Sequence, residues 1–150
     1  MTKKDLETIK KTAEKLFGLL QIEGKISVEK AEEGVSVVLE TDDSGIVIGH
    51  HGETLEALQL VLSLVCQKEL GEFVRIALEV GDYRKTREEY LKNLAQSSKE
   101  RALSEDGEVT LPMLKSWERR LIHLMFQDDK EVSSESVGEG RERVLVVRPR

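Results

Sequence analysis

The chain has few cysteines, prolines and aromatic residues, and it lacks long hydrophobic runs. Its single cysteine, Cys66, excludes an internal disulfide and fits a reducing cytoplasm. No apolar run approaches the roughly 18 residues that span a bilayer. The N-terminal sequence MTKKDLETIK also lacks the apolar stretch of a secretory signal. We therefore expect a cytoplasmic protein with no membrane insertion.

Charged residues are abundant, at 35% of the chain, and the formal net charge is -6. Residues 1–80 carry 9 basic and 15 acidic side chains, whereas residues 111–150 carry 8 and 7. A negative total argues against a nucleic-acid partner. Local patches, however, set the affinity of a protein for phosphate. The charge of the whole chain therefore decides little.

Apolar spacing predicts a helix and a hairpin at the start of the chain. Residues 25–40 alternate on either side of Glu33 and Gly34, which indicates two strands. Residues 4–22 carry apolar side chains at spacings of three and four, which indicates an amphipathic helix. These side chains are Leu6, Ile9, Ala13, Leu16, Phe17 and Leu20.

Two further helices and a strand are expected before residue 81. A polar turn offers Asp42, Asp43 and Ser44 as caps for a short helix that ends at Gly49. A strand is expected over residues 73–80. Residues 53–70 are apolar on more than one face, which predicts a helix buried against a sheet. Its stripes are Leu55, Leu58, Leu62 and Val65, and Ala57, Val61 and Leu64.

The second half of the chain predicts another small α+β segment. Residues 82–106 indicate a polar helix that joins the halves without forming a core, with Tyr83, Tyr90, Leu91 and Leu94 as its apolar contacts. The sequence EVTL indicates a short strand. Residues 131–149 indicate a closing hairpin that turns at residues 138–140. A helix over residues 114–127 is expected to turn four side chains inward, Trp117, Leu121, Leu124 and Met125, with Ile122 and Phe126 beside them. A solvated cluster is expected at Arg84, Lys85 and Arg87.

Gly49 and Gly52 bracket two histidines, His50 and His51, between the short helix and the long one. Glycine lets a backbone approach a ligand without interference from a Cβ atom. The free amides and the positive dipole end of the long helix would face a ligand in this loop. Such an arrangement suits a sugar-phosphate backbone, and a plain tight turn is the alternative.

The histidine pair does not predict a metal site. Adjacent side chains diverge, and the remaining histidine, His123, is distant in the sequence. No cysteine or second histidine cluster accompanies the pair. Acid–base catalysis by His51 is equally unsupported, because no nucleophile or paired carboxylate lies nearby in the sequence. We expect no cofactor, no metal and no enzymatic activity.

The order of elements and the sequence IGHHG resemble a KH domain with an N-terminal helix, over residues 1–80. The resemblance implies that the loop from Ile48 to Gly52 clamps the backbone of about four nucleotides. It also implies an apolar groove for bases, with contributions from Ile46, Val47 and Ile48. Many KH loops carry Lys or Arg between the glycines, whereas this loop carries two histidines. We therefore expect weaker and more pH-sensitive binding.

Arg119 and His123 are four residues apart on one face of the helix predicted over residues 114–127, with Lys115 one turn earlier. Both side chains can donate to phosphate oxygens. Alternatively, they brace the terminal hairpin by pairing with its acids or carbonyls. The Arg-x-x-x-His helix and the hairpin after it resemble an R-3-H domain, which implies an association with single-stranded nucleic acids. The hairpin adds Arg141, Arg143, Arg148 and Arg150, of which Arg143 is the best candidate contact.

A KH domain over 1–80, a connecting helix over 81–104 and an R-3-H domain over 105–150 together resemble the Jag family, also called KhpB, of bacterial RNA-binding proteins. The expected fold class is α+β: a helix-strand-strand-helix-helix-strand KH domain, then a small R-3-H domain with antiparallel strands. Longer members carry an additional N-terminal domain, which this chain is expected to lack.

The expected function is binding of single-stranded RNA, or of single-stranded DNA, by two sets of residues. The alternative is a protein-interaction adaptor or dimerisation module with little nucleic-acid affinity. A homodimer, or a heterodimer with another KH protein, is the corresponding protein partner. The expected contact residues are Ile48, Gly49, His50, His51, Gly52, Lys115, Arg119, His123 and Arg143. Trp117 is expected in the core rather than as a platform for bases.

Overall fold

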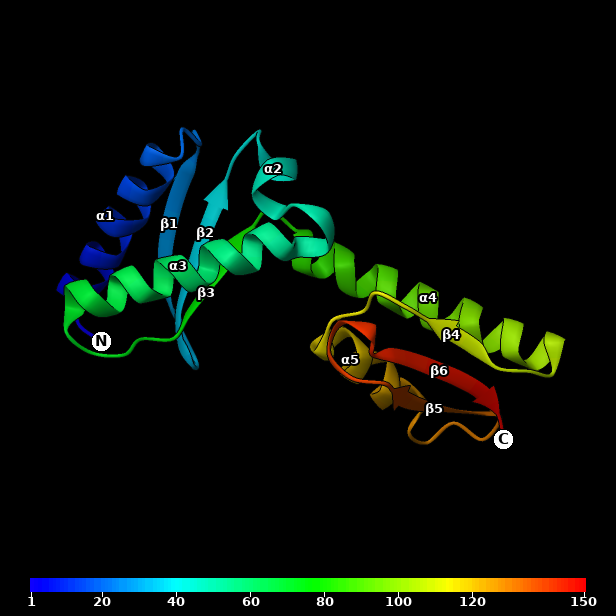
Figure 1. The fold of residues 1–150 in the computed structure, drawn as a ribbon. Helices are drawn as coiled ribbons and strands as arrows, with labels where there is room; N and C mark the ends of the chain where they lie inside the picture. Colours follow the sequence, from blue (N-terminus) through cyan, green and yellow to red (C-terminus); the bar gives the residue numbers. More distant parts are fainter. The chain divides into compact units, whose positions relative to one another are not determined.

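The computed structural model describes residues 1–150 and divides them into two compact units, Met1–Arg84 and Lys85–Arg150. Each unit contains one three-stranded sheet with helices against it (Figure 1). No helix in either unit combines the length and the apolar character that crossing a bilayer requires. The mixture of helices and small sheets confirms the predicted α+β class.

The first unit follows the predicted order of elements. Strand β1 pairs antiparallel with β2, and β2 pairs parallel with β3, in the order β1-β2-β3. A parallel pair requires a crossover connection, which α2 and α3 supply. The elements are α1 (Lys3–Leu19), β1 (Lys25–Ala31), β2 (Gly34–Glu40), α2 (Ser44–Ile48), a 3-10 turn (His50–Gly52), α3 (Glu53–Leu70) and β3 (Ile76–Val80).

One face of this sheet forms the core with α1 and α3. Strand β2 alternates strictly, with Val35, Val37 and Leu39 buried and the residues between them half-exposed. Helix α1 adds a buried stripe at the predicted spacing of four: Ile9, Ala13 and Phe17. Leu20, expected in that stripe, is instead 47% exposed at the end of the helix.

Helix α3 is buried against the sheet as expected, but only part of its apolar surface is covered. Leu62 and Cys66 are almost inaccessible, whereas Val61 and Leu64 are 43% and 57% exposed. The reason is geometric, because the sheet lies on a single side of α3 and no other element covers the opposite side. Burial raises the pKa of the Cys66 thiol to about 11, with a smaller contribution from Glu69, which disfavours the reactive thiolate form.

The expected side-chain cap of α2 is absent. Asp43 occupies the N-cap position, but its side chain makes no capping hydrogen bond. Its backbone amide instead donates to Oγ1 of Thr41 at 3.1 Å. The turn before α2 is therefore held by Thr41, which also donates to the carbonyl of Glu23 at 2.6 Å.

The second unit is built on an antiparallel sheet in the order β4-β6-β5. Leu145 and Val147 of the central strand face the core with no exposed surface. Arg148, the residue after Val147, lies on the outer face of the sheet. The elements are α4 (Tyr83–Glu105), β4 (Val109–Leu111), α5 (Ser116–Phe126), β5 (Val132–Val137), a 3-10 turn (Gly140–Glu142) and β6 (Val144–Pro149).

Helix α4 is part of this core, contrary to the expectation that it only joins the halves. Leu91, Ala95 and Ala102 are fully buried in one cluster with residues of β4, α5 and β6. The apolar contacts expected at Leu91 and Leu94 are present, but the helix looked too polar to form a core because the other three buried positions hold small residues, Ala95, Ser98 and Ala102. Small side chains allow close packing, but they leave a weak apolar pattern in the sequence.

The inward face of α5 was also predicted wrongly. Ile122 and Phe126 are buried, whereas Trp117 and Leu124 are 41% and 54% exposed. The third inward residue is Glu118, which has no exposed surface. Its Oε1 accepts a hydrogen bond from Nε of Arg87 at 2.7 Å. Arg87 is therefore not part of a solvated cluster, since its side chain is only 10% exposed.

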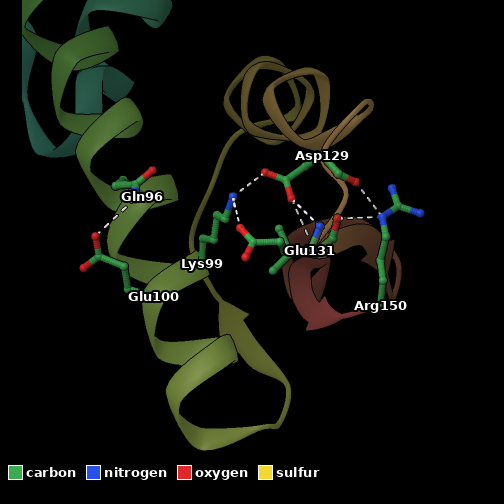
Figure 2. A network of polar contacts seen from close by, with 7 residues as sticks. Gln96, Lys99, Glu100, Asp129, Glu131 and Arg150 are labelled. Carbon is green, nitrogen blue, oxygen red and sulfur yellow. Dashed lines mark hydrogen bonds and ion pairs between the residues drawn. The ribbon is translucent and has the colours of Figure 1, made fainter.

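A polar network closes the second unit around the loop between α5 and β5 (Figure 2). Nζ of Lys99 lies 2.7 Å from Oδ2 of Asp129 and 2.9 Å from Oε2 of Glu131. Nε of Arg150 donates to the carbonyls of Asp129 and Val132 at 2.7 and 2.9 Å. These contacts tie α4 and the last residue of the chain to one loop. They hold the pKa of Asp129 down at about 2, chiefly through the hydrogen bond from Lys99.

This network predicts acid sensitivity of the second unit. The folded-state pKa of Asp129 lies below the ordinary value of 3.8. Its stabilising contribution is therefore complete above pH 3.8 and is lost as the pH falls toward about 2. Asp129→Asn should lower the urea midpoint at neutral pH and weaken its dependence on acid. Fluorescence of Trp117, the only tryptophan, reports the unfolding of this unit.

The control is Asp128→Asn, because Asp128 is exposed and lies outside the network. It should behave like the parent chain at both neutral and acidic pH. Equal acid dependence in Asp129→Asn and the parent would show that the network does not contribute.

Candidate nucleic-acid interface

The glycine loop of the first unit is a tight turn between α2 and α3. The amide of Gly49 donates to the carbonyl of Gly45 at 2.9 Å and ends α2. Gly52 precedes α3 as its N-cap, in a left-handed conformation with φ 78° and without a side-chain cap. The first amides of α3 are thus left without a capping side chain, which is the condition for binding an anion there.

Both glycines are required by the close packing around the loop. An ideal Cβ atom on Gly49, where φ is 70°, would lie 2.1 Å from Oγ1 of Thr54. One on Gly52 would lie 3.0 Å from the ring of Tyr83. Thr54 was not predicted from the sequence, and Tyr83 was expected only as an apolar contact of the connecting helix. A small side chain after the second glycine and an aromatic residue shortly after β3 are the available signals for them.

The electrostatics of the loop are poor for a phosphate clamp. The rings of His50 and His51 stack with their centroids 3.9 Å apart, and His50 is exposed. Both acidic residues in the first turn of α3, Glu53 and Glu56, are exposed and oppose an incoming phosphate. The loop therefore offers backbone amides and imidazoles without a permanent cation.

The expected apolar groove beside the loop has a different composition from the one predicted. Ile46 is 73% exposed and stands free to contact a ligand. Ile48 is half-buried and packs against the core. Val47 is fully buried, so it cannot line a groove. Successive side chains of a helix point in different directions around its axis. Ile46, Val47 and Ile48 therefore do not all face the same side.

The start of α5 positions two of the predicted basic residues. Lys115 is the N-cap, and its amide donates to Oε2 of the buried Glu118 at 3.0 Å. The guanidinium of Arg119 folds back along the helix. Its Nη1 donates to the carbonyl of Leu114, and its Nη2 donates to Oγ of Ser116 at 3.2 Å. Arg119 is therefore held beside the first turn of α5 rather than against His123.

His123 and Arg143 are held instead by two serines of β5. Nδ1 of His123 lies 2.8 Å from Oγ of Ser134. Nε of Arg143 donates to Oγ of Ser136 at 2.8 Å. The structure thus brings an α5 residue and a residue of the β5–β6 turn onto one strand. Neither serine was predicted, and the alternation of V-S-S-E-S-V in a strand is the signal that could have found them.

The remaining hairpin arginines have other environments. Arg148 lies on the outer face of the sheet, 3.3 Å from Oε1 of Glu108 and 3.4 Å from Oε2 of Glu135. Arg150 belongs to the network around Asp129. Arg141 is exposed in the turn before β6. Arg148 and Arg150 are therefore held by other groups of the second unit, and Arg143 alone joins His123 on the helix side of the sheet.

No group of three or more His, Cys, Asp or Glu side chains is arranged to hold a metal ion. The chemistry of the two residue sets is that of hydrogen-bond donors and cations. Amides, imidazoles and guanidinium groups all recognise oxyanions such as phosphate.

Comparisons with known proteins agree with this architecture. Residues 7–78 match the family model of the KhpA/KhpB KH domain, and residues 89–149 match that of the R-3-H domain. The chain is 35% identical over 136 residues to the "RNA-binding protein KhpB" of Clostridium symbiosum. It is 30% identical over 128 residues to the protein of that name from Lactiplantibacillus plantarum. The chain is thus similar to the KhpB (Jag) proteins over both of its domains.

The shared regions cover most of this chain and part of each relative. They span 89% of the chain and 61% of the Clostridium protein, and 85% and 40% for the Lactiplantibacillus protein. A third relative, from Bacillus subtilis, is 28% identical over 81% of the chain and 60% of its own length. The resemblance seen in the sequence is thus confirmed, and so are its KH and R-3-H domains. The R-3-H match includes most of α4, in agreement with the buried residues of that helix.

The loop geometry predicts that Gly49→Ala destabilises the first unit. A side chain there adopts an unfavourable left-handed conformation and meets Thr54, at a cost of about 1–3 kcal/mol. Gly45→Ala is the matched control, because nothing lies within 4 Å of a Cβ atom at that position. It should be neutral or stabilising by up to about 1 kcal/mol in α2.

Far-UV circular dichroism during urea unfolding measures the first unit together with the second. Trp117 fluorescence isolates the second unit, which neither substitution should affect. Equal midpoints for the two alanine variants would contradict the tight loop.

Proposed function

We propose that this chain binds single-stranded RNA, or single-stranded DNA, through two sites and catalyses no reaction. The first site is the loop from Ile48 to Gly52. The second, here called the R-3-H basic cluster, consists of Lys115, Arg119, His123 and Arg143. One observation carries the proposal. His123 and Arg143 both contact the same face of strand β5, and each keeps further N–H groups that can donate to a ligand.

The relatives support the choice of RNA. The three relatives described above each bear the name "RNA-binding protein KhpB" and match 81–89% of this chain. The location proposed for this activity is the cytoplasm, which the single, buried, unreactive cysteine supports.

The two sites contribute different interactions. The loop offers the uncapped amides of α3, and a backbone amide can hold a phosphate oxygen without a charge on the side chain. The R-3-H basic cluster offers permanent charge from Arg119 and Arg143. Most of the Coulomb attraction for RNA therefore comes from the second unit. Two weak sites on one chain gain affinity because binding at one raises the effective concentration at the other.

A second candidate function, docking of another protein, is supported by the exposed side of α3. Leu60 and Leu64 are 62% and 57% exposed there, and Leu19 of α1 is 76% exposed. A groove of about 380 Å³ runs between α1 and α3, lined in part by Leu16, Leu19 and Val65. A second copy of this chain, or another KH protein, would be the partner. Binding to such an apolar surface would depend weakly on salt, in contrast to binding of RNA.

Salt dependence tests the R-3-H basic cluster. In titrations of a single-stranded RNA by fluorescence anisotropy, Arg119→Gln and Arg143→Gln should each weaken binding. Each should also reduce the slope of log K against log salt by roughly 0.7, the value for one phosphate contact on a single strand. Arg148→Gln is the matched control, since Arg148 is paired with acids on the outer face of the sheet. Slopes that are unchanged in both cluster variants would exclude this site.

The pH dependence of RNA affinity tests the contribution of the histidines to binding. All three histidines of the chain lie in the two proposed sites. Imidazoles gain positive charge on acidification, so RNA binding should tighten between about pH 8 and about pH 5.5. His50→Lys should strengthen binding at pH 8 and make it less dependent on pH. His50→Gln should remove the same part of the pH dependence without strengthening binding. An affinity that is constant over this range would contradict the role of the histidines.

A further inference from the structure

Two hydroxyl groups interrupt the core-facing side of β5. Strand alternation puts Val132, Ser134 and Ser136 on one face of the sheet. On the same face, Ser134 is the cross-strand neighbour of Val147 and Ser136 that of Leu145 in β6. Val132 is fully buried, whereas both serines are half-buried. Apolar side chains at these two positions would extend the core. The serines do not add apolar surface to the core. Each instead contacts one basic side chain, His123 or Arg143.

Ser134 sets the orientation of His123. Because Nδ1 of the ring lies 2.8 Å from Oγ of Ser134, the other nitrogen, Nε2, is directed away from the strand. When the serine hydroxyl donates to Nδ1, the proton of the neutral ring is on Nε2. When the ring is charged, Nδ1–H donates to Ser134 and Nε2 still carries its proton. In these two forms Nε2–H can donate to a phosphate oxygen, whereas the neutral ring that is protonated on Nδ1 donates to Ser134 and has no proton on Nε2.

Ser136 sets the orientation of the Arg143 side chain in a similar way. Its Oγ accepts the Nε–H of the guanidinium at 2.8 Å, which leaves the two Nη groups to a ligand. These groups form the planar fork that binds phosphate oxygens in pairs. An arginine in a turn loses much side-chain entropy on binding, and a hydrogen bond in the unbound protein lowers that loss.

The two anchoring serines are two residues apart on one strand, which places them about 7 Å apart. That separation is comparable to the distance between successive phosphates of an extended nucleic-acid strand. We infer that Ser134 and Ser136 are positioning residues that hold His123 and Arg143 to contact two successive phosphates of one RNA strand. This inference rests on the proposed RNA binding, and it assigns the register of the contacts to strand β5.

The test uses the full chain and a fluorescent oligouridylate as the probe. Ser134→Ala and Ser136→Ala should each weaken binding about two- to tenfold, which is the range for the loss of one hydrogen bond. Neither should change the salt slope, because no charge is removed. Ser133→Ala is the matched control, since Ser133 lies on the same strand and faces the other way. Ser134→Thr keeps a hydroxyl and should restore most of the affinity.

A double-mutant cycle separates positioning from general stabilisation. If Ser136 acts through Arg143, Ser136→Ala should have no further effect on binding in an Arg143→Gln background. Additive losses would instead show that Ser136 acts on the fold and would overturn the inference for this pair. Ser134→Ala should also shift the ¹⁵N imidazole signals of His123 in the unbound protein, whereas Ser133→Ala should leave them unchanged.

The outcomes distinguish this inference from the proposed function. Binding that depends on Arg119 and Arg143 but is unchanged in both serine-to-alanine variants overturns only the positioning role. Binding that is insensitive to Arg119→Gln and Arg143→Gln overturns the R-3-H basic cluster itself. Trp117 fluorescence during urea unfolding verifies that each variant is folded.

Discussion

The buried carboxylate of Glu118 is the interaction on which the second unit depends. One oxygen accepts from Arg87 of α4, and the other accepts from the amide of Lys115 at the start of α5. A charge with no exposed surface is tolerated only when it is paired and hydrogen-bonded, and the loss of one partner of such a pair typically costs about 3–5 kcal/mol. This pair fixes the first turn of α5 against α4. The pair thereby sets which face of α5, with Arg119 and His123 on it, is turned away from α4.

The same interaction explains why the faces of α5 were predicted wrongly while its limits were nearly correct. Periodicity treats a charged residue as exposed, so Glu118 shifted the apparent inward face toward Trp117 and Leu124. A buried ion pair cannot be found in one segment alone, because its partner is on another helix. In α4 the buried positions are mainly small residues, which periodicity does not weigh. By contrast, strands β2 and β6 have strong apolar alternation or runs, and both hairpins were predicted with their turns.

The candidate sites were only partly predictable for related reasons. The paired glycines and the Arg-x-x-x-His spacing are local patterns, and the structure places them at the loop and on α5 as expected. The hydrogen-bond partners of these residues come from elsewhere in the chain. Thr54 and Tyr83 restrict the glycines, and Ser134 and Ser136 hold His123 and Arg143. Sequence spacing identified the cations, but the strand register that orients them became visible only in the fold.

A direct test of two-site RNA binding is an NMR titration of the ¹⁵N-labelled chain with a short single-stranded RNA. Amide signals should move in two groups, at residues 48–54 and around α5, β5 and the β5–β6 turn. The second group should move at lower RNA concentrations, because the permanent cations lie there. Signals on the exposed side of α3 should stay in place. Shifts confined to α1 and α3, with the loop and β5 unchanged, would contradict RNA binding at these sites and favour protein docking.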